Sequence, residues 1–449
     1  MRTLPKNLNF CKRRRTLSGF VKTPTPAGFH CLVPLAGSRT SSSPLRGSSS
    51  IYTCSRITHV SAVYNPIAIS HTARSISFHQ PFKMSDDEAD PELLALLRQA
   101  LQGNPSPPQE PETGVLQDAE YICNSSIDVA LDMRSTKNAA EAIYSQMQDR
   151  SYSPSTWSDH ELHPKTKDEG TVGFIFLMDL LNFSFWSERP ESERFAVMYR
   201  GRRWTGYWSL VAAIQRALDE DIPITDPHFW INEEEFTLDT LRHVFRSTSD
   251  EEIPLLEQRL ACIREAGRVL YGKYQCSIPN LIAAANGSAA ELVNILARDF
   301  EAFRDEHVFE GRRKLVRFLK RAQIFVADLW ACFEGEGYGE FRDIDKITMF
   351  ADYRVPQILC GLGCMSYSPK LDAAVRRGEV IDSGSSWEMQ MRGCSIWCVE
   401  LIRREIIRQH PEARVNAILI DFFLYDLMKE MEAAGKESMP HHRTRSIWY

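Results

Sequence analysis

Apolar residues in the body of this chain recur every three or four positions, which is the spacing of one face of an α-helix. The segments with this pattern are 208–218, 255–274, 289–303, 315–333, 397–408 and 417–432, whereas residues 118–148 have mixed apolar spacing. Ser288-Ala-Ala-Glu291 opens one of them as a capping box, and Thr205-Gly206 leads into another. Strand-like alternation is scarce, with residues 174–177 as the best short candidate. The pattern predicts one mainly α-helical domain over residues 115–449, with few short strands.

The first 85 residues differ in charge from the rest of the chain. They contain twelve Lys or Arg and no Asp or Glu, so the formal net charge of −6 for the whole chain becomes −18 for the remainder. A body this acidic binds nucleic acid poorly unless its basic residues gather in one patch. We therefore expect no stable nucleic-acid partner.

Residues 1–83 have two interpretations. A stretch rich in Arg, Ser and Thr, without acids or a compact apolar region, is typical of a mitochondrial transit peptide. Alternatively, translation starts at Met84, the upstream part is an extension, and the protein is cytoplasmic. Either way we expect residues 1–83 to be disordered. Residues 84–114 are predicted to form an acidic helix followed by a Pro-rich linker at 102–113.

The cysteines give no zinc-binding pattern. All eleven lie outside CxxC or Cys–His arrangements. Cys360/Cys364 and Cys394/Cys398 are each four residues apart, a spacing that on a helix could supply half a metal site. We favour small buried side chains in a reducing compartment, and expect neither metal nor cofactor.

No apolar run is long enough to cross a membrane. The best candidate, residues 172–186, is interrupted by Asp179 and Asn182. Within such a run we interpret Asp179 as an internal cap or a hydrogen-bonded core acid.

Residues 343–357 combine an apolar run with acids, and end on Asp352, Tyr353 and Arg354 just before a proline. A carboxylate in apolar sequence is expected to be partly buried, which requires a partner or a function. Pro356 disfavours helical geometry at Val355, so residues 352–354 are predicted to lie where one element stops and another starts. One interpretation is an Asp–Arg pair that fixes a helix end; the other is a catalytic carboxylate.

Three segments of this chain resemble those of the queuosine salvage protein family. They are ITMFADYRVPQIL at 347–359, RGCSIWCVELIR at 392–403 and FLMDLLNFSFWSE at 176–188. Enzymes of this family hydrolyse the N-glycosidic bond of queuosine 5′-phosphate and release queuine. The resemblance runs from about residue 118 to residue 449. It implies a helical fold similar to that of the helical DNA glycosylases, with ribose 5-phosphate as the second product.

The resemblance makes Asp352 the first catalytic candidate. Cleavage develops positive charge on the ribose, which a carboxylate can stabilise or attack at C1′. Queuine has carbon where guanine has N7, so protonation there cannot assist departure of the base. Lys320 is the second candidate, because helical DNA glycosylases also place a lysine ahead of an essential aspartate. It would hold the phosphate or tune Asp352; the alternative is a solvated lysine on a helix face.

Queuine is cationic at neutral pH, so its recognition should use carboxylates and an aromatic platform. The resemblance favours Phe341, Asp343 and Asp426 as base contacts, with Asp421 and Tyr425 next. His163 could hydrogen-bond the base, and Tyr353 is a further substrate-binding candidate. The alternative for each acid is a cap or an ion pair, and for His163 a turn histidine before proline. The glycine-rich loop 334–339 would carry Phe341 and Asp343 over the pocket as a lid.

Two further predictions concern charged residues around the pocket. Asp328 could face the pocket or pair with Arg321. The candidate phosphate ligands fall into two clusters, Arg202 with Arg203, and His441, His442, Arg443 and Arg445.

The leading function is hydrolysis of queuosine 5′-phosphate. The alternatives are a base-excising nucleic-acid glycosylase and a non-catalytic helical module that binds queuine or tRNA. Nothing in the sequence selects an oligomeric state.

Overall fold

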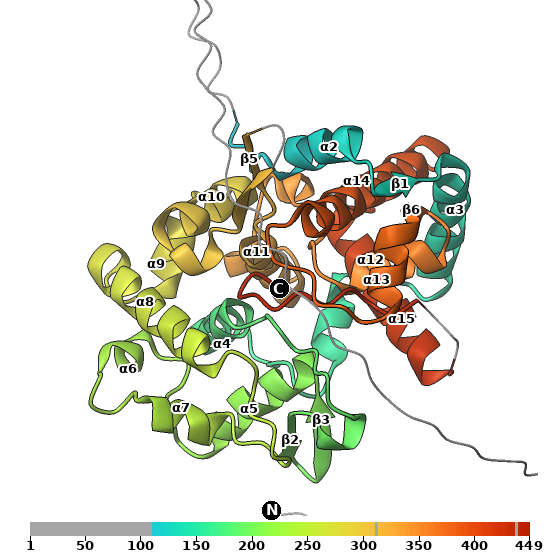
Figure 1. The fold of residues 1–449 in the computed structure, drawn as a ribbon. Coiled ribbons are helices and arrows are strands. Elements are labelled where there is room, and N and C mark those ends of the chain that lie inside the picture. The colour runs from blue at the N-terminus through green and yellow to red at the C-terminus, as the bar shows by residue number, and fades with distance from the viewer. Residues whose placement is uncertain (1–109, 310–312, 436–438) are drawn as a thin grey trace, which may run out of the picture. The chain divides into compact units, whose positions relative to one another are not determined.

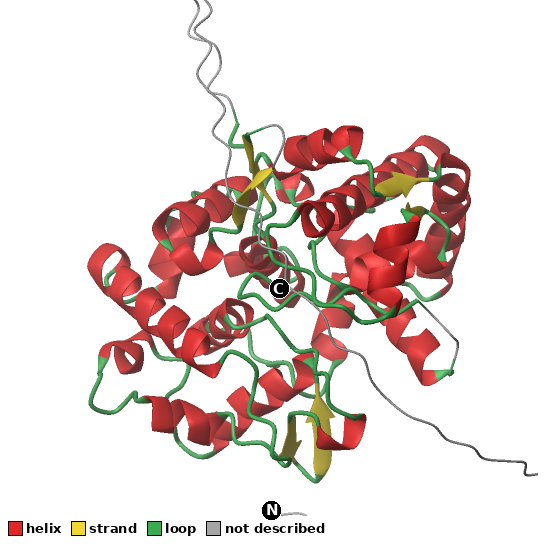
Figure 2. Cartoon of the chain, viewed as in Figure 1, coloured by secondary structure: helices red, strands yellow, loops and turns green. Residues whose placement is uncertain are grey.

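The computed structural model describes residues 110–309, 313–435 and 439–449, and helices dominate these residues (Figures 1 and 2). The first α-helices are α2 (Val115–Ser125), α3 (Met133–Asp149), α4 (Glu169–Leu180), α5 (Tyr207–Asp219), α6 (Pro227–Ile231), α7 (Leu238–Val244) and α8 (Leu256–Tyr274). The later ones are α9 (Ile278–Ala283), α10 (Ala289–Asp299), α11 (Lys320–Cys332), α12 (Arg354–Gly361), α13 (Pro369–Arg376), α14 (Ser386–Gln409) and α15 (Ala417–Ala433). The predicted mainly α-helical class is confirmed.

The described strands form separate antiparallel pairs. They are β1 (Val129–Leu131) with β6 (Met365–Tyr367), β2 (Ala196–Tyr199) with β3 (Arg202–Thr205), and β4 (Glu306–Phe309) with β5 (Lys314–Arg317). The β1–β6 pair joins residues more than 200 positions apart, with Ala130 opposite Ser366. The predicted domain boundaries before residue 110 lie outside the described residues.

Most predicted helices occur close to their expected positions. Segments 208–218, 255–274 and 417–432 correspond to α5, α8 and α15. Gly206 precedes α5 with a positive φ of 60°, a conformation that favours glycine. The Ser288 hydroxyl accepts a hydrogen bond from the main-chain N–H of Glu291 at 3.1 Å, which caps α10 as predicted.

Three local predictions are wrong. Residues 174–177 lie inside α4, where every side chain from Thr171 to Leu180 is buried, so no amphipathic stripe marks the helix. Segment 315–333 begins as strand β5 before α11 starts. Val355 is helical, because Pro356 occupies the first turn of α12, where a missing N–H costs no helical hydrogen bond.

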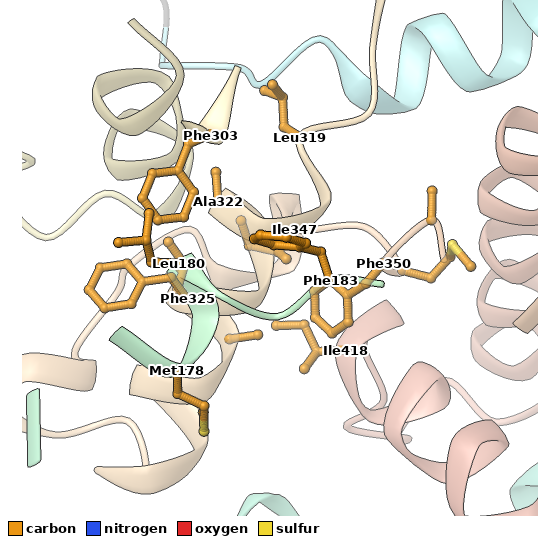
Figure 3. Packing of buried hydrophobic residues seen from close by; sticks show 14 of the residues in the cluster. Met178, Leu180, Phe183, Phe303, Leu319, Ala322, Phe325, Ile347, Phe350 and Ile418 are labelled. Carbon is orange, nitrogen blue, oxygen red and sulfur yellow. The ribbon is translucent and has the colours of Figure 1, made fainter. Parts of the chain in front are cut away.

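The apolar core brings four distant segments together. Figure 3 shows Phe183 after α4, Leu319 before α11, Phe350 before α12 and Ile418 in α15 within one cluster. Each of these side chains is at most 2% exposed. A polar residue lies within three positions of each, so packing of the core also gathers a set of polar groups. α11, near the centre of Figure 1, packs against α4 and α10.

None of the helices in the described part of the chain is both long and apolar enough to cross a membrane.

Candidate active site

Lys320 is the first residue of α11 and is almost completely buried. Its side chain is 4% exposed, and its ammonium donates a hydrogen bond to the carbonyl of Asn182 at 3.0 Å. This burial rules out the solvated lysine considered as an alternative. Burial lowers the pKa of Lys320 to about 8, and three nearby carboxylates act in the opposite direction. They belong to Asp352, Asp179 and Asp421.

Asp352 lies where the chain enters α12. Its Oδ1 accepts hydrogen bonds from the main-chain N–H groups of Arg354 at 2.7 Å and Val355 at 3.0 Å, which caps the helix. The Arg354 guanidinium does not pair with it, but donates to Glu432 at 2.7 Å. No described residue donates a hydrogen bond to Asp352 Oδ2. One oxygen therefore holds the helix start and the other is available to a ligand.

Asp421, on α15, is a second carboxyl group beside Asp352. It is 6% exposed, and its Oδ2 accepts a hydrogen bond from the main-chain N–H of Phe350 at 3.1 Å. Burial raises its pKa well above the ordinary range, and the negative charge of Asp352 raises it further. Burial and the nearby charge thus favour the protonated form of Asp421. Two carboxyl groups in different environments can then play different roles.

Asp179 and Asp328 are two further buried acids near Lys320. Asp179 is 0% exposed, and neither of its carboxylate oxygens has a hydrogen-bond partner among the described residues. Burial raises its pKa, as does the charge of Asp328, while Asn182 acts in the opposite direction. Asp179 is thus a buried core acid, as expected, with Asn182 and Asp328 as its polar neighbours.

Asp328 lies on α11 and is 5% exposed. Burial raises its pKa above the ordinary range. Pairing with Arg321 is not observed, because that guanidinium donates to the carbonyls of Leu180 and Ala302. The charge of Asp328 also raises the pKa of Tyr207, which places the phenol near the acids. Sequence reasoning noted both acids but did not select them; acids inside apolar runs were the available signal.

The four main-chain carbonyls of residues 180–183, at the end of α4 and just after it, are each bound by a cationic side chain. The donors are Arg321 to Leu180, Arg259 to Leu181 and Phe183, and Lys320 to Asn182. The two Arg259 contacts measure 2.6 and 2.5 Å. The Leu180 carbonyl belongs to the negative end of the α4 dipole, so a cation there is stabilising. The arrangement fixes the segment that contacts Lys320.

His163 is held in a fixed orientation by an aromatic wall. Its ring stacks on Trp157 at 3.8 Å between centroids, and Nδ1 donates to the Trp157 carbonyl at 2.7 Å. Burial lowers the pKa of His163 to about 3, so the ring is neutral. Nε2 therefore accepts a hydrogen bond, from the Tyr207 hydroxyl at 3.0 Å. Tyr207 links His163 to the buried acids.

Tyr353 and Tyr425 lie beside Asp352. Both phenols have a raised pKa because they are buried, and the charge of Asp352 raises each pKa further. The Tyr353 ring lies 4.7 Å from the His441 ring and 6.4 Å from the Tyr449 ring. The C-terminal segment therefore reaches the catalytic candidates.

Three predicted base contacts have other partners in this structure. Asp343 accepts from the Ser288 hydroxyl at 2.7 Å and the Ala289 N–H at 2.6 Å, at the start of α10. Phe341 is 8% exposed and belongs to the core. Asp426 is exposed and accepts from the Tyr152 hydroxyl at 2.6 Å. Base contact by these residues stays a prediction.

The two candidate phosphate clusters differ in their surroundings. Arg202 donates to Glu161 at 2.9 Å, and Arg203 donates to main-chain carbonyls. The Arg445 guanidinium, by contrast, lies 3.6 Å over the Trp186 ring. Burial lowers the pKa of Arg445, and Tyr353 is one of the neighbours that act in the opposite direction. The C-terminal cluster is therefore the one that lies beside the predicted catalytic residues.

Within the described ranges, no group of three or more His, Cys, Asp or Glu side chains is arranged to hold a metal ion.

The model of the family described as queuosine salvage protein matches residues 162–449. This chain belongs to that family. The matched range contains Lys320, Asp352 and Asp421. The family that the sequence segments suggested is thereby confirmed.

Individual relatives agree with the family match. A Schizosaccharomyces pombe protein named queuosine 5′-phosphate N-glycosylase/hydrolase is 46% identical over 349 residues, covering 75% of this chain and 99% of the relative. A Mus musculus protein of the same name is 40% identical over 349 residues, covering 76% and 99%. A Sphaerobacter thermophilus protein of that name is 36% identical over 337 residues, covering 75% and 98%.

Proposed function

We propose that this chain hydrolyses the N-glycosidic bond of queuosine 5′-phosphate and releases queuine and ribose 5-phosphate. The observation that carries the proposal is the meeting of Asp352, Lys320 and Asp421, from three separate elements, in a chain of this family. The names of relatives that align over nearly their whole length support the same substrate.

Asp352 is the group that faces the reacting sugar. Its Oδ1 is bound to the start of α12, so the side chain is oriented and Oδ2 can approach C1′. There it stabilises the developing cation or attacks it directly. The ammonium of Lys320, held against the Asn182 carbonyl, lies near this carboxylate, whose charge raises the pKa of Lys320 against the effect of burial.

Asp421 supplies the proton that the departing base needs. Its raised pKa favours the protonated form, as expected of a general acid. The proton passes to queuine as the glycosidic bond breaks. Asp421, now ionised, takes a proton from the water that attacks C1′, so the site returns to its starting state.

The 5′-phosphate is proposed to bind at the C-terminal cluster. Arg445 and His441 lie beside Tyr353, the neighbour of Asp352. Arg202 is engaged by Glu161 instead. An arginine next to an aromatic ring can still offer its remaining N–H groups to a phosphate.

The test is incubation of the full chain with queuosine 5′-phosphate and detection of free queuine by mass spectrometry. Asp352→Asn retains an acceptor for the cap but loses the charge, so we expect kcat to fall by about 1,000-fold with the fold intact. Asp372→Asn, on the exposed surface of α13 and paired with Arg376 at 2.7 Å, is the matched control and should leave kcat unchanged.

The other outcomes separate the alternatives. Equal release by wild type and Asp352→Asn would move the catalytic role elsewhere, with Lys320 tested next. Saturable binding of queuine without release would favour the non-catalytic binding module. Tight, salt-dependent binding of oligonucleotides would favour the nucleic-acid glycosylase.

A further inference from the structure

Arg392, on α14, touches the segment that carries Asp352 although it lies outside the proposed site. It is 0% exposed. Its Nε donates a hydrogen bond to the carbonyl of Ala351 at 2.9 Å. The same guanidinium binds Asp305 with both terminal nitrogens, at 3.0 Å to Oδ1 and 2.5 Å to Oδ2. One planar group therefore joins the residue before Asp352 to Asp305.

Asp305 in turn holds the start of the helix that carries Lys320. Its Oδ2 accepts a hydrogen bond from the Lys320 main-chain N–H at 3.3 Å. Its main-chain carbonyl accepts from the N–H of Phe318 at 3.0 Å and of Leu319 at 3.3 Å. The chain Ala351–Arg392–Asp305–Lys320 is therefore continuous in hydrogen bonds.

We propose that the buried Arg392–Asp305 ion pair is a positioning device that sets the separation between Asp352 and Lys320. The inference rests on the function proposed above. Neither partner needs to touch the substrate, so both act through the groups that they hold. A misplacement of about 1 Å in such a group can cost about 100-fold in rate.

The surroundings of Arg392 fix the plane of its guanidinium. The Phe318 ring centroid lies 4.1 Å and the Tyr449 ring centroid 4.5 Å from its central carbon. Glu388, one helical turn earlier on α14, lies 3.3 Å from Nη1. With its plane held by rings and its terminal nitrogens by carboxylates, Nε can point in one direction, toward Ala351.

A purely stabilising role would not require this pair. Two charges that are 0% and 3% exposed carry a large desolvation penalty, and apolar replacements of buried pairs are often equally stable. Although burial opposes ionisation of both groups, their attraction raises the pKa of Arg392 and lowers that of Asp305, so both remain charged. What an apolar pair could not supply is directed hydrogen bonds to two separate segments.

The experiment is Arg392→Lys in the full chain, with kcat and KM measured well below the melting temperature of the variant. Lysine keeps the charge beside Asp305 but cannot donate to Asp305 and Ala351 in the fork geometry. We expect kcat to fall roughly 10- to 100-fold with KM changed less than about threefold. The control is Arg264→Lys on α8, which removes a 3.0 Å hydrogen bond from the guanidinium to the Phe236 carbonyl. This variant should leave kcat and KM unchanged.

A double-mutant comparison distinguishes positioning from loss of stability. If Arg392 acts through the catalytic groups, Arg392→Lys should reduce the residual rate of Asp352→Asn far less than it reduces the wild-type rate. Equal fold-losses in both backgrounds would overturn the inference. A wild-type kcat in folded Arg392→Lys, together with an inactive Asp352→Asn, would also overturn the inference. That result would leave the proposed function standing. Full activity of Asp352→Asn would overturn both the positioning inference and the catalytic role proposed for Asp352.

If Arg392→Lys does not fold, Tyr449 offers a second test. Tyr449→Leu removes a ring from the guanidinium and should lower kcat several-fold, whereas Tyr449→Phe keeps the ring and should lower it less. Identical kcat values for the two variants would overturn the inference.

Discussion

At the scale of single residues, environment gives chemically identical side chains different roles. Asp352 and Asp421 are both aspartates, but Asp352 is half-buried with one oxygen on a helix start, whereas Asp421 is 6% exposed. Burial and the charge of Asp352 raise the pKa of Asp421 well above its ordinary value. Division of labour between an ionised and a protonated carboxyl is what cleavage of a glycosidic bond requires.

The charge of Lys320 should make stability depend on pH. The pKa of this ammonium is about 8 in the folded chain, against an ordinary value of 10.5. The unfolded state therefore binds more protons between these values, and the free energy of unfolding should rise with pH from about 8 to 10.5. At 1.36 kcal/mol per pKa unit, the full contribution of Lys320 to the free energy of unfolding is of the order of 3 kcal/mol. It is present above pH 10.5 and is lost as the pH falls through 8.

The measurement is urea unfolding at several pH values from 7 to 11, for the wild type and for Lys320→Met. The difference between the two free energies of unfolding should grow across this window in favour of the wild type, because methionine does not titrate. Parallel curves would mean that Lys320 has an ordinary pKa in the folded protein. Other groups that titrate in this range cancel in the comparison.

At the scale of elements, helix ends supply most of the polar contacts that build the site. Asp352 caps α12, Asp343 lies at the start of α10, and Lys320 begins α11 while binding a carbonyl just after α4. Helix ends leave main-chain groups without helical partners, so polar side chains gather there. A capping acid and a ligand-binding acid therefore look alike in sequence.

Asp343 offers a test of this ambiguity. Because both of its oxygens are engaged at the start of α10, we expect Asp343→Ala to lower the free energy of unfolding by about 1 kcal/mol with KM unchanged. Urea unfolding and steady-state kinetics measure the two quantities. A tenfold rise in KM at unchanged stability would instead support the predicted contact with the base.

At the scale of the whole molecule, the last residues complete the structure around the site. The Ser184 N–H donates to the Tyr449 carbonyl at 3.1 Å, and the Trp186 indole donates to the Thr444 carbonyl at 2.8 Å. Trp186, Tyr353 and Tyr449 form a small apolar cluster of their own. The tail thus joins the segment after α4 to the neighbour of Asp352.

Deletion of residues 446–449 should therefore destabilise the protein and slow the reaction. Loss of a buried aromatic side chain costs about 3–5 kcal/mol, which corresponds to roughly 4–7 °C in Tm for a domain of this size. Calorimetry and queuine release measure the two effects. Ser446→Ala, which removes a 3.2 Å contact to the Trp448 N–H, is the control and should cost less than about 1 kcal/mol. An unchanged Tm would show that the tail is dispensable.

Much of this architecture was predictable from local pattern. Helical spacing located α5, α8, α10 and α15, because each buries one face and exposes the other. The all-buried α4 has no such stripe, so its apolar residues 174–177 looked like a strand. Short-range sequence information also marked Asp352, since an acid in an apolar run requires a partner or a function.

The sequence by itself determined the helical class, the family and the main catalytic candidates, because helix periodicity and family segments are local properties. Only the tertiary structure decided which acids meet Lys320, that Asp179 is fully buried near Asp328, and that Arg392 reaches Ala351. These contacts join residues from tens to more than a hundred positions apart. Their strength depends on burial and distance, and both quantities exist only once the core has brought the segments together.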